Sequence, residues 1–255
     1  MKKWLQKICI ILLILACVLP FSFVLFQSFF NSDGQLSGIA YYQVFLTEPV
    51  YLFRFWKSLL MCLFIVVGQL VVTVLGGFGF AKYNFPEKHI LFTILMILMT
   101  LPVQVTLVPN YILFDKLHML DSWSALILPA AFSPLGTFIT MQSFKAIPNE
   151  VIDAAKIDGC NLMQVLRCVV VPIARGGIIS AGILAFLDSW NMVEQPLAYL
   201  KSFASYPLSV ALSVAFPSEV NVQMAASLLV LIPPLLLFLY FNHDLVEGIV
   251  IGEEK

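Results

Sequence analysis

The sequence predicts an all-α membrane protein with six transmembrane helices and both termini in the cytoplasm. Of the 255 residues, 60% are hydrophobic and only 11% are charged, and the mean hydropathy is +0.95. Apolar runs long enough to cross a bilayer recur along the chain, since a membrane-spanning helix needs about 20 such residues. Six spans and their connections use the whole length, so we expect a single transmembrane domain over residues 1–255.

The first two spans are expected at about 8–30 and 58–81. The first apolar run is longer than the core of a signal peptide and no small-residue cleavage site follows it, so we interpret it as a retained span. The second span contains a set of glycines that predicts close contact with another helix, namely Gly68, Gly76, Gly77 and Gly79.

The third and fourth spans are expected at about 90–114 and 123–144. The third is dense in prolines and amides, among them Gln104 and Asn110. Lipid cannot satisfy the carbonyls that prolines leave without a partner, so this composition predicts a kinked helix that lines a polar interior.

The last two spans are expected at about 176–192 and 223–241, and Asp188 is the one acid inside any predicted span. A charge there costs on the order of 3 kcal/mol, so a reason for it is expected. Two interpretations of Asp188 stay open. In the first it lines a cavity, where it binds a solute hydroxyl or a proton. In the second it is paired or hydrated near the outer vestibule and has no role in selectivity. Trp190 beside it could stack on a sugar ring. The weaker cavity candidates are Gln104, Asn110 and Asn191.

The placement of basic residues predicts the orientation. With both ends inside, ten Lys and Arg lie in inner segments, namely Lys2, Lys3, Lys7, Lys82, Lys88, Lys145, Lys156, Arg167, Arg175 and Lys255. The outer segments hold four, namely Arg54, Lys57, Lys116 and Lys201. This excess predicts a cytoplasmic N-terminus and a cytoplasmic loop over 145–175.

The loop over 145–175 reads locally as helix, turn, helix. Asn149 is a good N-cap, and acids follow in the first helical turn. Helical periodicity places Val151, Ala154 and Ala155 on one side. Gly159 is expected to form a left-handed C-terminal cap. On these features alone, a re-entrant or interfacial hairpin is favoured over a protein contact.

The second helix of this loop is expected to begin at Asn161, three residues before Gln164, and to end at Pro172. The remaining chemistry of the sequence is sparse. We find no P-loop, no metal-ligand spacing among the three histidines, no nucleophile motif and no paired-cysteine motif. We therefore expect no catalytic residue, no metal site, no cofactor and no nucleic-acid partner, and any uphill transport must draw its energy from a partner subunit or an ion gradient.

The loop resembles the cytoplasmic "EAA loop" of binding-protein-dependent ABC importer permeases. The matching residues are Pro148, Glu150, Ala154, Ala155, Ile157, Asp158, Gly159 and Pro172. Asp153 stands where the family has Glu, and Cys160 where it has Ala. Three further stretches resemble the family: Ala81–Pro86, the Leu-Pro-x-Gln pattern at 101–104, and Trp190-Asn191 followed by Pro196-Leu197. The last pattern is typical of the carbohydrate-importing, maltose-permease-like branch.

The resemblance implies a type I importer permease fold in the bacterial cell membrane. It implies three kinds of protein partner: a second, homologous permease subunit, a dimeric ABC ATPase, and an extracytoplasmic solute-binding protein. The residues implied to dock on the ATPase are Glu150, Asp153, Ala154, Ala155, Ile157, Asp158 and Gly159. The implied solute is a sugar or oligosaccharide. Two alternatives stay open, namely a permease of the same class for a polyamine or phosphate ester, and a secondary transporter with Asp188 as its proton site.

Overall fold

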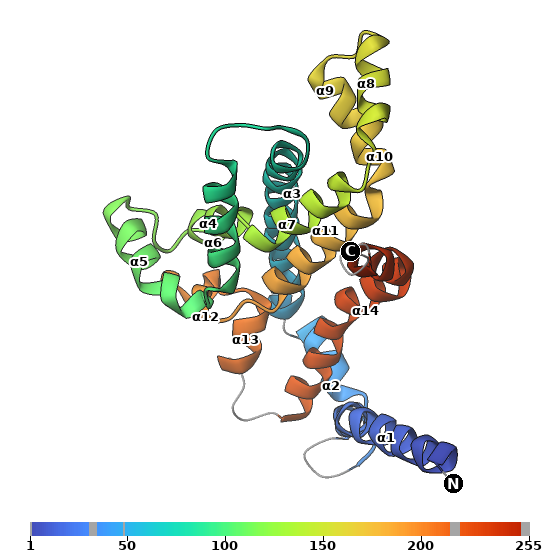
Figure 1. Cartoon of the computed structure of the whole chain (residues 1–255). Coiled ribbons are helices and arrows are strands. Elements are labelled where there is room, and N and C mark those ends of the chain that lie inside the picture. The colour runs from blue at the N-terminus through green and yellow to red at the C-terminus, as the bar shows by residue number, and fades with distance from the viewer. Residues whose placement is uncertain (1, 31–34, 48, 215–219, 251–255) are drawn as a thin grey trace. The chain divides into compact units, whose positions relative to one another are not determined.

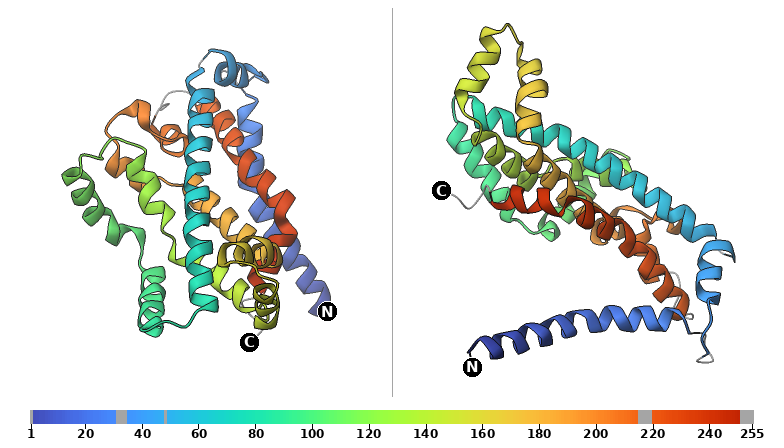
Figure 2. Two further views of the ribbon diagram at one scale, coloured as in Figure 1. Left: turned by 90° about the horizontal axis from the view of Figure 1, so that it is seen from above. Right: turned by 90° about the vertical axis from the view of Figure 1, so that its right-hand side faces the viewer.

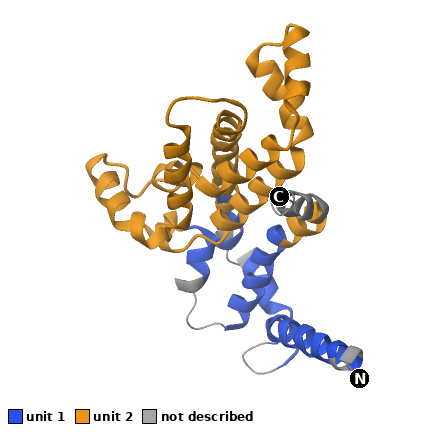
Figure 3. Ribbon diagram, in the orientation of Figure 1, with its two compact units in different colours: residues 1–57, 207–234 blue, residues 58–206, 235–255 orange. Residues whose placement is uncertain are grey.

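The computed structural model describes residues 2–30, 35–47, 49–214 and 220–250 (Figure 1). These residues form helices and one isolated β-bridge between Phe30 and Leu36, and they contain no strand. The all-α prediction is therefore confirmed for the described part of the chain. Lys255, which entered the orientation argument, lies outside the described residues. The chain divides into two compact units, residues 1–57 with 207–234 (unit 1) and residues 58–206 with 235–255 (unit 2) (Figure 3).

Four described segments are long and apolar enough to cross a membrane: Gln6–Ser28, Tyr51–Lys82, Ser124–Lys145 and Val220–Asn242. Two pairs of helices also qualify together, each pair meeting at a sharp bend. Lys88–Thr100 meets Val103–Lys116 at 101°, and Leu162–Ile173 meets Arg175–Trp190 at 83°. The segments number six when each bent pair counts as one span. They then follow the order of the six predicted spans.

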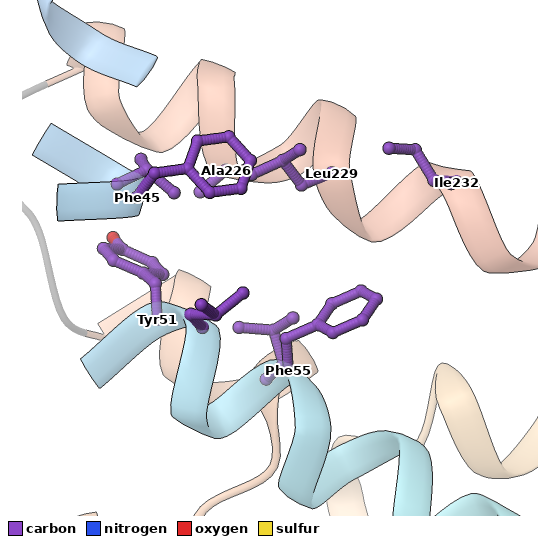
Figure 4. A pocket seen from close by; sticks show the side chains of 9 residues that line it. Phe45, Tyr51, Phe55, Ala226, Leu229 and Ile232 are labelled. Carbon is purple, nitrogen blue, oxygen red and sulfur yellow. The ribbon is translucent and has the colours of Figure 1, made fainter. Parts of the chain in front are cut away.

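Unit 1 contains α1 (Lys2–Ser28), α2 (Ile39–Tyr42), the π-helix η1 (Gln43–Thr47), α13 (Leu208–Val214) and parts of α3 (Pro49–Lys82) and α14 (Val220–Val250). Its core combines residues from both of its sequence segments, 1–57 and 207–234. They are Ala40, Val44, Tyr51, Leu208, Leu212, Val222, Ala225 and Ala226. An apolar pocket of about 200 Å³ lies beside this core, and Figure 4 shows Tyr51 and Phe55 on one side of it and Phe45, Leu229 and Ile232 on the other.

Unit 2 holds the remaining helices. They are α4 (Lys88–Thr100), α5 (Val103–Lys116), α6 (Ser124–Ala131), α7 (Pro134–Lys145), α8 (Asn149–Ile157), α9 (Leu162–Gln164), the π-helix η2 (Val165–Val170), α10 (Val171–Ile173), α11 (Arg175–Trp190), α12 (Glu194–Tyr199) and the 3₁₀ turn η3 (Phe203–Ser205). The rest of α3 and the end of α14 also belong to this unit. The helices α7 and α11 share the most extensive contact among its elements.

The predicted kink of the third span is a complete break between α4 and α5. Leu101 has the extended conformation (φ −72°, ψ 126°) that a following proline favours, and Pro102 then caps α5. Pro109 lies inside α5, so the second half of this span also has an interrupted hydrogen-bond ladder. The chain therefore turns through 101° at a place where the sequence predicts only a kinked helix.

Close packing of α3, α7 and α11 depends on glycine. A Cβ at Gly77 would lie 2.9 Å from the backbone nitrogen of Met141, and a Cβ at Gly177 would lie 2.6 Å from the Cβ of Ser143. Any larger residue would force these helices apart. The glycine-mediated contact predicted for the second span occurs at Gly77 and also at Gly68 and Gly76, where a Cβ would lie 3.4 Å from Ala131 and 3.3 Å from Thr137. A Cβ at Gly79 would meet nothing within 4 Å.

Candidate functional site

The predicted loop forms a helical hairpin, defined here as residues 147–173. Figures 1 and 2 show α8 and α9 side by side at its tip, projecting from the other helices of unit 2. The inner side of α8 packs on η2. The buried residues between them, Ile152, Ala155, Val165 and Leu166, belong to one apolar cluster with Phe78 and Phe144. The hairpin thus has a core of its own that continues toward the ends of α3 and α7.

The turn after α8 confirms the prediction of a left-handed cap. Gly159 has φ +86°. Its N–H donates to the Lys156 carbonyl at 3.0 Å, and the N–H of Cys160 donates to the Ala155 carbonyl at 3.0 Å. This pair of bonds is a Schellman motif, which satisfies the last carbonyls of the helix. Local sequence therefore determines where α8 ends.

The second helix of the hairpin begins as predicted. Asn161 Oδ1 accepts the N–H of Gln164 at 2.9 Å, and Gln164 Oε1 accepts the N–H of Asn161 at 2.8 Å. This reciprocal capping box fixes the start of α9. The prediction that Pro172 ends the helix is wrong, because the chain stays helical through Ile173 and bends at Ala174. Pro172 lies at the start of α10, where a missing N–H is tolerated.

One prediction about α8 is also wrong. Pro148, not Asn149, occupies the N-cap position, and Asn149 is the first helical residue. The buried side of α8 consists of Ile152 and Ala155, whereas Val151 and Ala154 are exposed. The reason is tertiary, because η2 packs on the Ile152 side of the helix.

The outer side of the hairpin combines acids with exposed apolar side chains. Ile157 is 86% exposed, and Leu162 and Met163 are 55% and 60% exposed. The other exposed members of the predicted set are Glu150, Asp153, Ala154, Asp158 and Gly159. Asp153 pairs with Lys156 at 3.2 Å, and this exposed ion pair adds little stability. Of the predicted set, only Ala155 faces the interior of the hairpin.

A cavity of about 560 Å³ lies in unit 2 among α3, α4, α5, α6, α7, α11 and α12. Its polar lining residues are Gln69, Thr106, Asn110, Ser133, Asp188, Ser189, Gln195 and Tyr199. Among the described lining residues, Asp188 is the only one with a charged side chain. The rest of the wall is apolar and includes Leu98, Met99 and Phe132.

The five residues predicted to line a cavity fall into two groups in the structure. Asp188 and Asn110 line the cavity, whereas Gln104, Trp190 and Asn191 are not among its lining residues. Gln104 Nε2 donates to Glu194 Oε1 at 2.8 Å, which joins α5 to α12. Trp190 is buried and stacks on Phe186, with ring centroids 5.5 Å apart. Asn191 Nδ2 donates to the Leu187 carbonyl of the same helix at 2.9 Å.

Sequence reasoning missed several polar residues of the cavity, above all Gln69 and Gln195. Gln69 gave a usable signal, because it is an amide in an otherwise apolar span and it is 7% exposed. Ser133 and Ser189 gave no such signal, since serines are common in membrane helices and each one here hydrogen-bonds within its own helix or cap. Among the described residues, no group of three His, Cys, Asp or Glu side chains could hold a metal ion.

The turn between α5 and α6 holds the end of α12, which contributes Tyr199 to the cavity. The backbone N–H groups of Lys201 and Ser202 donate to Asp121 Oδ1 at 3.0 and 3.2 Å. These bonds lower the pKa of Asp121 from its ordinary value. The stability that these two hydrogen bonds give to the folded chain is therefore fully present above the ordinary carboxyl pKa. It is lost as the pH falls through the lowered pKa of Asp121.

The family described as "Binding-protein-dependent transport system inner membrane component" matches residues 70–248, which is more than half of the chain. The chain is 29% identical over 209 residues to the "Arabinooligosaccharides transport system permease protein AraQ" of Bacillus subtilis (strain 168), covering 81% of this chain and 74% of that protein. It is 31% identical over 205 residues to the "sn-glycerol-3-phosphate transport system permease protein UgpE" of Yersinia enterocolitica, covering 78% and 73%.

A solved structure shares the fold. It is described as "Crystal structure of a bacterial ABC transporter involved in the import of the acidic polysaccharide alginate". The TM-score is 0.85 at 17% sequence identity, and the match covers 95% of each chain. At that identity the likeness concerns the fold alone.

Proposed function

Since the chain belongs to the family of binding-protein-dependent transport system inner membrane components, we propose that it is the permease subunit of an ATP-driven importer for a sugar or oligosaccharide. The chain is a multi-pass membrane protein and a transport subunit, not an enzyme, and ATP hydrolysis in these systems belongs to a separate subunit. Membership of this family implies an ATPase and a solute-binding protein as partners in general. Family membership gives no support to the alternative of a proton-coupled secondary transporter.

The outer side of the hairpin is the proposed docking surface for the ATPase. The observation that carries this proposal is an exposed apolar group, Ile157, Leu162 and Met163, next to the acids of α8. A projecting helix with apolar anchors and a polar rim suits insertion into a groove. The docking set is Glu150, Asp153, Ala154, Ile157, Asp158 and Gly159. Ala155 supports it from inside, because its side chain packs in the hairpin core.

The proposed cycle transmits motion from this surface to the cavity. ATP binding closes the ATPase dimer, the hairpin moves with it, and the cavity changes from facing inward to facing the binding protein. This is a shift between two arrangements, to which ATP contributes the differential binding. A second, homologous permease subunit is proposed to complete the translocation path.

A pull-down in mild detergent tests the docking surface. The tagged chain is expressed with its genomic neighbours, and the proteins that co-purify are identified. We expect the wild type to retain a P-loop ATPase and a second permease. Ile157→Asp is expected to weaken ATPase retention by about tenfold or more, because it places a charge at an apolar anchor. The matched control is Leu117→Asp, a 55% exposed leucine in the turn after α5. Equal ATPase retention by the two variants would refute docking at this surface.

The lining of the cavity supports a hydroxyl-rich solute. Amides, hydroxyls and one carboxylate can exchange hydrogen bonds with a sugar. A phosphate ester carries a charge of about −2, and it would meet Asp188 with no Lys, Arg or His among the described lining residues. The phosphate ester remains the second candidate because of the 31% identity to the permease described for sn-glycerol 3-phosphate. A polyamine would find only a single carboxylate.

Uptake into vesicles that contain the purified complex separates the two candidates. The probes are an arabino-oligosaccharide and sn-glycerol 3-phosphate, each tested with the solute-binding protein encoded by a genomic neighbour. We expect ATP-dependent uptake of the oligosaccharide to be much faster than that of the phosphate ester. Uptake of the phosphate ester alone would overturn the sugar assignment and leave the importer class intact.

A further inference from the structure

The last residue of α3 is bound to the start of α8. The Lys82 ammonium donates to the backbone carbonyl of Ile147, 65 residues away in sequence, and to Asn149 Oδ1 at 3.1 Å. The Lys82 side chain is half-buried, and a charged donor makes both bonds stronger than bonds between neutral groups. The second predicted span is therefore connected directly to the hairpin.

Helix electrostatics alone does not explain this contact. The N-terminal end of α8 carries a partial positive charge, which disfavours a nearby ammonium group. Glu150, in the first turn of α8, attracts the Lys82 ammonium, although the described residues show no direct ion pair between them. Lys82, Asn149 and Glu150 thus form one polar cluster at the base of α8, and part of the acidic character of α8 is directed toward α3.

An apolar contact accompanies the polar one. Phe78, four residues before Lys82 on the same helix face, is 5% exposed. It packs in the cluster that contains Ile147 and Ile152, and its ring meets Phe144 edge-on at 6.3 Å. One face of α3 therefore contacts the hairpin through an aromatic ring and an ammonium group. The ring contact is non-directional, whereas the two hydrogen bonds fix a definite position.

We propose that Lys82 is a positioning residue for energy coupling, because it fixes α8 to α3 so that displacement of the hairpin moves the second predicted span. This inference rests on the proposed docking of an ATPase on the hairpin. Without Lys82, the link from hairpin to α3 consists of apolar packing, and apolar surfaces can shift against each other. The variant complex then hydrolyses ATP while its cavity fails to respond.

The test uses the complex of the chain with its co-purified ATPase in lipid nanodiscs. The variants are Lys82→Met, Lys82→Arg and Asn149→Leu, each combined with Thr106→Cys in a cysteine-free background. Thr106 lines the cavity, so the labelling rate of that cysteine by a membrane-impermeant maleimide, with and without ATP and vanadate, reports the cavity response. The ATP hydrolysis rate is measured on the same preparation. The matched control is Lys88→Met, because the Lys88 ammonium donates only to the Tyr83 carbonyl within the same turn, at 2.7 Å.

In Lys82→Met we expect the ATP-dependent change in labelling rate to fall by about fivefold or more, while ATP hydrolysis and ATPase retention stay at the level of the control. Lys82→Arg keeps a charged donor and is expected to retain most of the response, and Asn149→Leu should give an intermediate loss. An unchanged labelling response in Lys82→Met overturns the proposal. Loss of the ATPase from Lys82→Met also overturns it, since Lys82 would then support docking.

The failure of the proposed function gives a different result. If no ATPase docks on the hairpin, the wild-type chain and the Lys88→Met control both lack ATPase and show no ATP-dependent labelling change. A wild type that responds to ATP, with a Lys82→Met variant that also responds, refutes the coupling role and keeps the importer assignment.

Discussion

Asp188 sets the charge of the cavity, because it is the only charged side chain among the described lining residues. It lies near the end of α11, next to Ser189 in the sequence, and Asn110 of α5 also lines the cavity. A carboxylate accepts hydrogen bonds from sugar hydroxyls and repels a second anion. Discrimination between neutral and phosphorylated solutes is therefore expected to depend on this residue.

We expect Asp188→Asn to narrow the preference for an arabino-oligosaccharide over sn-glycerol 3-phosphate by about tenfold or more, because it removes the repulsion and keeps a polar side chain of the same size. The measurement is the ratio of uptake rates in the vesicle assay. Glu194→Gln is the control, since Glu194 lies close in sequence, bonds to Gln104 and is not a lining residue. A preference that falls equally in both variants would mean that net charge, not the cavity, selects the solute.

Residue types that are unusual in an apolar span marked two of the residues that line the cavity. Asp188 is conspicuous as an acid in an apolar span and Asn110 as an amide in one, and both residues line the cavity. Trp190 was placed there by analogy with a sugar-stacking ring, but Phe186 covers its face. The packing of Phe186 on Trp190 within α11 determines where this ring lies, and no local sequence pattern indicates that packing.

At the scale of the element, the hairpin depends on the backbone conformation of Gly159, which has φ +86°. We expect Gly159→Val to destabilise the α8 turn by about 1–2 kcal/mol, because a side chain disfavours the left-handed region. Gly159→Asn is the matched variant, since asparagine tolerates this conformation, and its cost should be smaller. Hydrogen exchange of the Cys160 amide, which donates to the Ala155 carbonyl, measures the effect. Equal protection in both variants would show that the turn is held by other contacts.

The boundaries of the hairpin helices were predictable because caps are local. Gly159, Asn161 and Gln164 act on backbone groups within four residues of themselves. The buried side of α8 was not predictable, because it depends on where η2 packs. The course of the chain after Pro172 was missed for a similar reason. A proline at the first turn of a helix looks the same in sequence as one that ends a helix.

At the scale of the molecule, composition and basic-residue placement predicted an all-α membrane chain, and the described helices and the family match agree with it. The order of spans followed from apolar runs alone. The 101° break between α4 and α5 and the division into two units did not, because bends and long-range contacts have no fixed signature in hydropathy. The cytoplasmic position of the two termini stays a prediction of the basic-residue count.

Close contact between α7 and α11 predicts a strong effect of a single methyl group. We expect Gly177→Ala to destabilise the chain by about 1–3 kcal/mol, because the new Cβ would lie 2.6 Å from the Cβ of Ser143. The thermal unfolding midpoint in detergent measures this, and Ser143→Gly in the same chain should restore part of the loss. Gly79→Ala is the control, since its Cβ would meet nothing within 4 Å. A midpoint equal to that of the control would show that α7 and α11 separate without cost.

The same contact constrains how the two helices can move. With no side chain between Gly177 and the wall formed by Ser143, α7 and α11 cannot slide past each other and must travel as one block. The hairpin meets this block at the 83° bend at Ala174, a residue that is 7% exposed. Displacement of the hairpin is therefore expected to reach α7 and α11 together, as one body.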